Sequence, residues 1–198
     1  MPWPWAQNVG PELSTEVGCS TKPTLSDERD VVEILGVPID RLDMTDSLAR
    51  IEAFILSGKP NRHVVVNASK LVMLKKDKHL ADVVRSCDLV NADGQSVVWA
   101  SRLLGCALPE RVAGIDLMTE LLRRSSKTGY RVYFLGARKE VVAKMVDRCH
   151  REFEGLRVAG WHSGYFEMGE ELHVLADIRS TRPDILFVAL GSPYQEYW

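Results

Sequence analysis

Hydrophobic and polar positions alternate with a clear helical period soon after residue 31. Apolar residues recur at the three- and four-residue steps that place side chains on one helical face. They are Leu48, Ile51, Phe54 and Ile55. The polar triplet Thr45-Asp46-Ser47 precedes this face and offers a helix cap, and the run Gly58-Lys59-Pro60-Asn61 ends it. The pattern predicts an amphipathic helix.

Short apolar runs then alternate with amphipathic segments to the end of the chain. The predicted strands are His63–Val66, Asp88–Val90, Arg131–Leu135, Leu156–Ala159 and Asp184–Leu190. The predicted helices are Ser69–Lys76, His79–Ser86, Gln95–Leu104, Ile115–Lys127, Glu140–Phe153 and Glu170–Thr181. Strands that are almost entirely apolar have no solvent-facing side, which is typical of a parallel sheet covered on both faces. We therefore predict a Rossmann-like, doubly wound, mostly parallel α/β fold.

Residues 1–30 differ from the rest of the chain. They mix Pro, Ser, Thr and Gly with scattered Trp and show no sustained period, which favours a flexible N-terminal arm followed by one domain over residues 31–198. Trp3 and Trp5 are open to two interpretations: a small partner-binding or interfacial anchor, or residues of a flexible tail.

Composition excludes several classes of protein. The chain has 198 residues, 45% of them hydrophobic and 26% charged, with a formal net charge of −2. These values are typical of a soluble globular protein and argue against a general nucleic-acid binder. The N-terminus lacks the features of a secretory signal, and the longest apolar runs fall far short of the roughly 20 residues of a membrane-spanning helix. We expect a cytoplasmic protein that contacts a membrane only peripherally.

Polar residues and glycines follow several of the predicted strands, where α/β sheets bind ligands. Asp93, followed by Gly94, could act as a general base on an acceptor hydroxyl, or it could cap the next helix through Gln95. Asn67 could hold a sugar hydroxyl or a phosphate oxygen, or it could be a turn or cap residue. The Gln195 amide could also point into the crevice.

Two further segments bear on the chemistry. Arg111 lies in a loop before a helix, where it could clamp a diphosphate or be a solvated surface residue. Gly136-Ala137-Arg138 lacks the remaining glycines of a dinucleotide fingerprint, so an NAD-dependent oxidoreductase has weak support. The cysteines and histidines lack metal-ligand spacing, and no DxD pair is present. Helix termini and Arg are therefore expected to neutralise any bound phosphate, with no metal and no cofactor.

Six blocks of the chain, taken in order, resemble the signature blocks of the WecG/TagA/CpsF family, also called glycosyltransferase family 26. They are VVVNASKLVML, CDLVNADGQSVVWASRLLG, PERVAGIDLMTELL, RVYFLGAR, GLRVAGWHSGYF and RPDILFVALGSPYQEYW. The resemblance implies an inverting, metal-independent hexosyltransferase of bacterial surface polysaccharide or teichoic acid synthesis. Such an enzyme moves N-acetylmannosamine, its uronic acid or a related sugar from UDP to an undecaprenyl-diphosphate-linked sugar. It would act at the inner face of the plasma membrane, and relatives form oligomers.

The resemblance also implies roles for individual residues. Asp93 corresponds to the general base, and the side chains that line the substrate pocket correspond to Asn67, Arg111 and Gln195. Gly94 and Gly136 are expected to shape the substrate and nucleotide site through their backbone.

The sequence departs from the family pattern in two places. Val65 stands where the family commonly has Thr, and the family continues past the GSPxQE block into a basic segment, whereas this chain stops at Trp198. A chain truncated at its C-terminus is therefore expected. These departures keep a second function open, a non-catalytic domain that binds a UDP-sugar or a protein partner.

Overall fold

The computed structural model describes residues 29–167 and 169–198, so the predicted arm and both of its tryptophans lie outside the described residues. The described residues form two compact units. Unit 1 contains residues 29–47 and 61–114, and unit 2 contains residues 48–60 and the described residues from 115 to 198. Helices α1 (Met44–Ser57) and α5 (Gly114–Thr128) each begin in unit 1 and continue into unit 2. We describe each unit by itself, and the division into an arm and one domain stays a prediction.

The first element of unit 1 is a hairpin that the apolar pattern did not predict. β1 (Val31–Ile34) pairs antiparallel with β2 (Val37–Asp40). The two linking residues, Leu35 and Gly36, both have positive φ, 52° and 74°. Two consecutive positive φ values are typical of the tight turns that match the twist of paired strands. Asn-Gly or Asp-Gly is the usual signal for such a turn, and Leu-Gly does not carry it.

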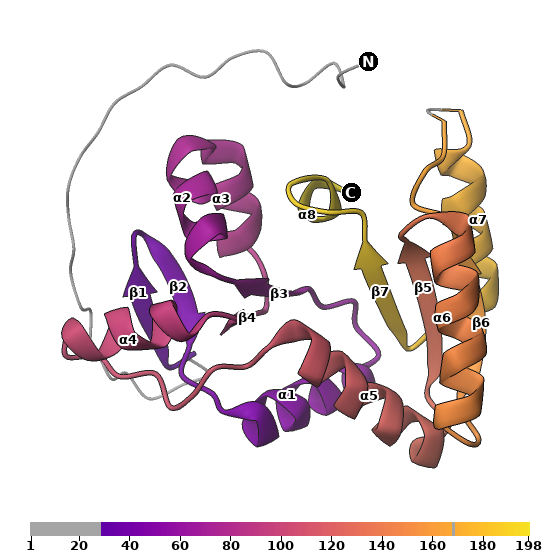
Figure 1. The fold of residues 1–198 in the computed structure, drawn as a ribbon, viewed down its shortest axis with the longest axis horizontal. Helices are drawn as coiled ribbons and strands as arrows, with labels where there is room; N and C mark the ends of the chain where they lie inside the picture. The colour runs from indigo at the N-terminus through magenta and orange to yellow at the C-terminus, as the bar shows by residue number, and fades with distance from the viewer. Residues whose placement is uncertain (1–28, 168) are drawn as a thin grey trace. The chain divides into compact units, whose positions relative to one another are not determined.

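The rest of unit 1 has the predicted alternation. β3 (His63–Val66) and β4 (Leu89–Ala92) pair in parallel, and α2 (Ala68–Lys76) and α3 (Lys78–Arg85) connect them. α4 (Gln95–Leu103) follows β4 (Figure 1).

The cap predicted for α1 was wrong. The helix already begins at Met44, so the triplet Thr45-Asp46-Ser47 lies inside it. Instead, Asp43 Oδ1 accepts a hydrogen bond from the backbone N–H of Asp46, at 2.8 Å. Either Asp43 or a residue of the triplet could have served as a cap by residue type, because Asp, Ser and Thr are all strong N-cap residues.

A buried carboxylate joins the hairpin to β4. Asp40, 4% exposed, accepts a hydrogen bond from the backbone N–H of Val90 at 2.7 Å. It also forms a bidentate ion pair with Arg29, whose Nε lies 2.8 Å from Asp40 Oδ1. The hydrogen bond to this carboxylate raises the pKa of Arg29. Since a buried charge without partners is costly, these contacts allow Asp40 to lie in the core of unit 1.

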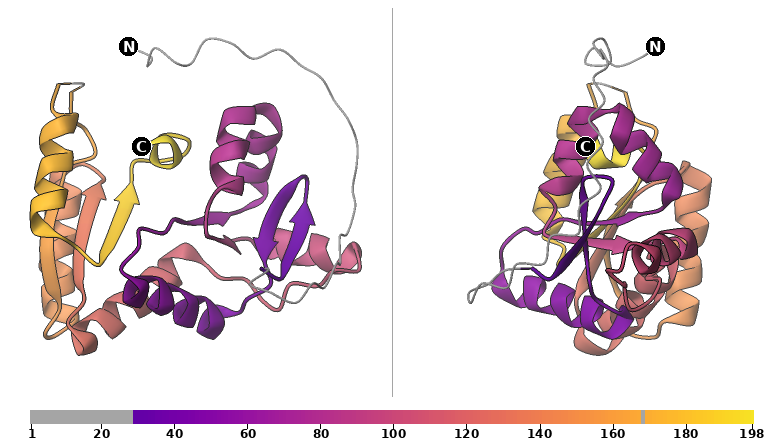
Figure 2. Two further views of the ribbon diagram at one scale, coloured as in Figure 1. Left: turned by 180° about the vertical axis from the view of Figure 1, so that it is seen from behind. Right: turned by 90° about the vertical axis from the view of Figure 1, so that its left-hand side faces the viewer.

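Unit 2 is a three-stranded parallel sheet in the order β6-β5-β7, with β5 (Arg131–Gly136) in the centre. β6 (Arg157–His162) and β7 (Ile185–Ala189) lie on either side of it. α6 (Lys139–Glu152) and α7 (Glu171–Thr181) cover opposite faces of this sheet, as the views from the front and from behind show (Figures 1 and 2). The short helix α8 (Tyr194–Tyr197) follows β7.

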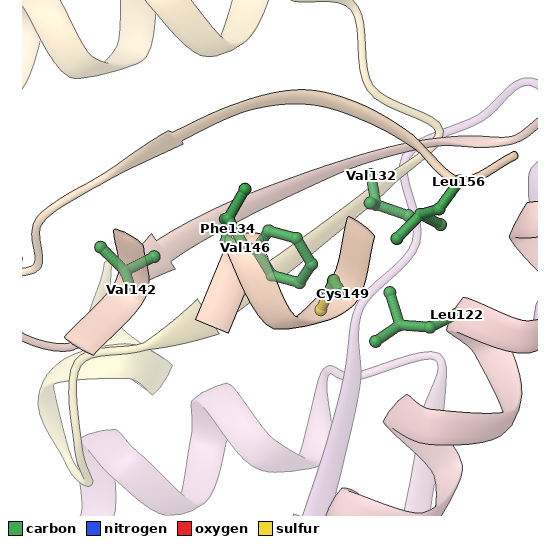
Figure 3. Close-up of a cluster of buried hydrophobic side chains, with 7 residues drawn as sticks. All are labelled: Leu122, Val132, Phe134, Val142, Val146, Cys149 and Leu156. Carbon is green, nitrogen blue, oxygen red and sulfur yellow. The ribbon is translucent and has the colours of Figure 1, made fainter. Parts of the chain in front are cut away.

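Alternate residues of β5 build two cores. Val132 and Phe134 pack on the α6 side with Val146 and Leu122 (Figure 3). Tyr133, together with Leu135, packs on the other side against Val174 of α7. Every residue of β5 from Val132 to Leu135 is at most 1% exposed, which explains why the strand is apolar throughout. The predicted fold class, α/β with parallel strands and helices on both faces, is confirmed.

Candidate functional site

Asn67 lies at the carboxyl end of β3 and forms the N-cap of α2. Its side-chain Oδ1 accepts a hydrogen bond from the backbone N–H of Lys70, at 2.9 Å. This is the cap that sequence reasoning left open as the alternative to substrate binding. The residue is nevertheless exposed. Its amide nitrogen is a donor that the cap does not use, so capping and substrate binding are compatible.

Asp93 follows β4 directly and does not cap the next helix. The N-cap of α4 is Gly94, which has no side chain that could cap the helix. The backbone N–H of Asp93 donates to Val66 O at 2.8 Å, so the end of β4 is fixed to the end of β3. Within residues 29–167 and 169–198, the half-buried Asp93 carboxylate has neither a hydrogen bond nor an ion pair. The position of Asp93 is therefore set by its backbone.

Two glycines lie near the residues at this strand end. A Cβ atom placed on Gly114 would lie 3.7 Å from Asp93 Oδ2 and 3.2 Å from Val65 Cγ2. A Cβ atom on Gly94 would lie 3.4 Å from Asn67 Cβ. Both glycines therefore lie close to residues at the ends of β3 and β4. Gly114 was not singled out from the sequence, although its place three residues after Arg111 in the PERVAG segment was visible.

The loop that carries Arg111 is fixed on both sides. The next residue, Val112, donates its N–H to Ala92 O, at 2.9 Å, immediately before Asp93. The preceding residue, Glu110, accepts a hydrogen bond from the N–H of Met44 at 2.7 Å. Arg111 itself is exposed. The structure thus brings its backbone to the same strand end as Asp93, within unit 1.

A polar chain that the sequence did not reveal lies behind the strand end. Asn91, fully buried on β4, donates from Nδ2 to Ser47 Oγ at 2.9 Å. Its Oδ1 accepts a hydrogen bond from His63 Nε2, also at 2.9 Å. In the apolar run LVNA, a lone Asn gave no sign that it would be buried. These bonds fix the strand that carries Asp93 from both sides.

The other two predicted site residues belong to unit 2. Gly136 ends β5 with φ +97°, and a Cβ atom there would lie 2.2 Å from Ala189 O of β7. A Cβ atom on Gly164 would lie 2.8 Å from Gly136 Cα. Close packing of strand ends therefore requires a glycine at position 136, independently of any ligand.

Gln195 is engaged in the turn after β7. Its Oε1 accepts a hydrogen bond from the N–H of Gly191 at 3.2 Å, and its Nε2 donates to Glu196 Oε1 at 3.1 Å. Ser192 Oγ also donates to Glu196 Oε1, at 2.9 Å. The side chain of Gln195 thus stabilises the turn, and its proposed contact with a substrate stays a prediction.

Unit 2 also holds a cavity of about 350 Å³ at the end of β6. Its walls are His162, Glu170, His173, Val174 and Asp177. Tyr133 donates its hydroxyl hydrogen to Asp177 Oδ2 at 2.6 Å. Burial, followed by this hydrogen bond, raises the pKa of Tyr133 above its ordinary value. Over the part of the chain that the structure describes, no three His, Cys, Asp or Glu side chains are placed to hold a metal ion.

The carboxyl ends of β3 and β4 therefore combine the Asp93 carboxylate, which makes no hydrogen bond within the described residues, the Asn67 amide and the loop that carries Arg111. The family model of the Glycosyl transferase WecG/TagA/CpsF family matches residues 32–198, which include all of these positions. The chain belongs to this family.

Individual members of the WecG/TagA/CpsF family are similar to most of the chain. A protein of Bacillus spizizenii is 34% identical over 167 residues, which cover 81% of this chain and 64% of the relative. A protein of Bacillus subtilis is 31% identical over 82% of this chain and 63% of the relative. A protein of Staphylococcus aureus is 31% identical over 84% of this chain and 66% of the relative. All three are named N-acetylglucosaminyldiphosphoundecaprenol N-acetyl-beta-D-mannosaminyltransferase. The matched part is less than two thirds of each relative's length.

Among residues 29–167 and 169–198, none of the helices combines the length and the apolar character needed to span a bilayer.

Proposed function

We propose that this chain is the catalytic part of an inverting glycosyltransferase. It moves an N-acetylhexosamine-type sugar, N-acetylmannosamine or its uronic acid, from UDP to a lipid-diphosphate-linked acceptor, without a metal ion. The family match and the names of the relatives support the reaction class and the acceptor. The observation that carries the proposal is the Asp93 carboxylate, which follows a strand end and makes no hydrogen bond or ion pair to the residues that the structure describes.

The proposed reaction is a single displacement. Asp93 takes the proton from the acceptor hydroxyl while that oxygen forms a bond to the anomeric carbon of the donor sugar. The bond between the anomeric carbon and the diphosphate oxygen breaks, and UDP leaves with the electron pair. Attack from the side opposite the leaving group inverts the anomeric configuration.

The remaining site residues have supporting roles in this proposal. The Arg111 guanidinium stabilises the negative charge that develops on the leaving diphosphate, and helix N-termini add to this effect. Asn67 uses its free amide hydrogens to hold a sugar hydroxyl or phosphate oxygen. Gln195 contributes to the substrate pocket, and the backbone at Gly136 contributes to the nucleotide site.

The test is UDP release from a panel of UDP-N-acetylhexosamines with a short-chain lipid-diphosphate acceptor. We expect release to require both the acceptor and Asp93, with Asp93→Asn slower by roughly 10²–10⁴-fold, the usual contribution of a general base. Asp82→Asn is the matched control, because Asp82 lies on the exposed face of α3 in the same unit and pairs only with Arg85 within the described residues. Its rate should equal that of the parent chain.

Two results would redirect the proposal. Full activity of Asp93→Asn would remove the general-base assignment. A chain that binds the UDP-sugar but releases no UDP, even when a relative's C-terminal segment is appended, would favour a non-catalytic UDP-sugar-binding domain.

A further inference from the structure

Helix α4 exposes apolar side chains at the end that lies away from Asp93. Trp99 is 62% exposed, Leu103 91% and Leu104 38%. Trp99 and Leu103 are four residues apart and share one face of the helix. The opposite face carries Val97, which is 1% exposed and packs into unit 1. The exposed residues therefore do not serve the core of the unit.

The outward face changes character along the helix. Its first turn, next to Asp93, exposes the polar residues Gln95 and Ser96. Its last turn exposes Leu103 beside Arg102, and the Arg102 guanidinium makes no hydrogen bond or ion pair within the described residues. A tryptophan, a leucine and an arginine at one helix end are the residue types found at a bilayer surface, where the ring lies at the level of the headgroups and the cation meets anionic lipid.

A bilayer or a second copy of the chain could cover this surface, and its size helps to choose between them. The surface is formed by Trp99, Arg102, Leu103 and Leu104. Its three apolar side chains expose on the order of 400 Å², since a whole Trp offers up to ~250 Å². Each partner in a stable protein interface contributes about 800 Å². The surface is thus too small to hold a second copy of the chain by itself, whereas shallow insertion into a bilayer needs only a few apolar side chains.

We propose that this end of α4 contacts an anionic lipid bilayer and presents Asp93 to the headgroup of the lipid-linked acceptor. The inference rests on the proposed function, because the lipid-linked acceptor gives the bilayer contact its purpose. α4 has 9 residues, so at ~1.5 Å per residue it is about 13 Å long. Asp93 lies just before the first turn of the helix, so contact of Trp99 and Leu103 with the bilayer keeps its carboxylate within about this length of the headgroups, where a lipid-linked sugar presents its reacting hydroxyl.

The test is co-sedimentation with vesicles of equal parts phosphatidylcholine and phosphatidylglycerol. The double variant Trp99→Ser/Leu103→Ser should bind these vesicles at least about tenfold more weakly than the parent chain. Leu172→Ser, at a residue that is 76% exposed on α7 of unit 2, is the matched control and should bind like the parent. Arg102→Gln should weaken binding to these vesicles and leave binding to pure phosphatidylcholine unchanged.

Several outcomes would overturn the proposal: a parent chain that does not bind the vesicles, or a double variant that binds as well as the parent. Equal binding combined with a loss of dimers in light scattering would identify a second copy as the occupant. Unchanged circular dichroism of the double variant shows that its fold is intact.

Activity measurements separate this proposal from that of the transferase. The double variant should release UDP at the parent rate with a water-soluble short-chain acceptor and at least about tenfold more slowly with a long-chain acceptor embedded in vesicles. If neither acceptor supports UDP release by the parent chain, with or without a relative's C-terminal segment appended, the transferase proposal fails, and vesicle binding alone still decides the role of α4.

Discussion

Replacing Gly136 by Ala should destabilise unit 2, whether or not a nucleotide binds there. The backbone at this position has φ +97°, a region that costs an L-residue about 1–2 kcal/mol. The new Cβ would also lie 2.2 Å from Ala189 O, so the ends of β5 and β7 must move apart. Overpacking of this kind costs about 1–3 kcal/mol. Because alanine also restricts the unfolded chain by about 0.4–1 kcal/mol, we expect a net loss of about 2–4 kcal/mol.

A second glycine isolates the steric part of this loss. Gly58 has φ +65°, but apart from its chain neighbours no described residue has an atom within 4 Å of a Cβ built on it. Gly58→Ala therefore carries the backbone cost alone, and we expect a net loss of about 1 kcal/mol or less. Urea unfolding followed by circular dichroism measures both variants against the parent chain. The expected difference corresponds to a midpoint about 1 M lower for Gly136→Ala, for a slope of about 1–3 kcal/mol per M.

Equal free energies of unfolding for the two variants would refute the steric reasoning. If Gly136→Ala kept its stability and lost only affinity for UDP-sugar, the glycine would be required by the ligand and not by β7. Loss of both would leave the close approach of the strands as the primary requirement, since a displaced strand end also distorts any site built on it.

Three further perturbations test the rest of the structure. Tyr133→Phe should remove a fall in stability that the parent chain shows above pH ~10. Because the pKa of Tyr133 is raised, the folded parent keeps a proton there that its unfolded chain loses, so the free energy of unfolding falls by ~1.4 kcal/mol per pH unit. Unfolding of both proteins at pH 9 and pH 11 measures this difference. Asp40→Ala should cost about 3–5 kcal/mol, because Arg29 and the Val90 N–H lose their acceptor, and a cost below 1 kcal/mol in urea unfolding would contradict this. Asn67→Asp should keep its helix cap and thermal stability but weaken UDP-sugar binding in calorimetry, and unchanged affinity would show that Asn67 is only a cap.

The regular elements were predictable because they depend on local pattern. The apolar run from Val132 to Leu135 is buried on both sides, and such runs identify central parallel strands without further information. The hairpin over residues 31–40 escaped because its turn, Leu35-Gly36, carries none of the usual turn signals. The partners that stabilise its buried Asp40 lie on other segments, so the local hydrophobic pattern could not predict that this carboxylate is buried.

Predicting the candidate site depended on a different kind of information. Position at a strand end was enough to select Asn67 and Asp93, because the parallel strands β3 and β4 bring their carboxyl ends to one edge, and Gln195 was selected in the same way after β7 of the other unit. Sequence alone could not separate structural from available side chains, since that depends on hydrogen bonds made after folding. Nor could it show that Gly136 lies against Ala189, more than 50 residues later in the chain.

The hydrogen bonds divide these strand-end residues into two groups. Asn67 uses its oxygen to begin α2, and Gln195 uses both ends of its amide in the turn after β7. A substrate that binds either residue must share it with the fold, which suits a positioning role in which the side chain is already oriented. The Asp93 carboxylate makes no hydrogen bond to the described residues, and its backbone is fixed by Val66 and by the turn into α4. In the proposed reaction Asp93 must gain and release a proton in each turnover, and a carboxylate that does not cap a helix can do so without weakening the scaffold that holds it.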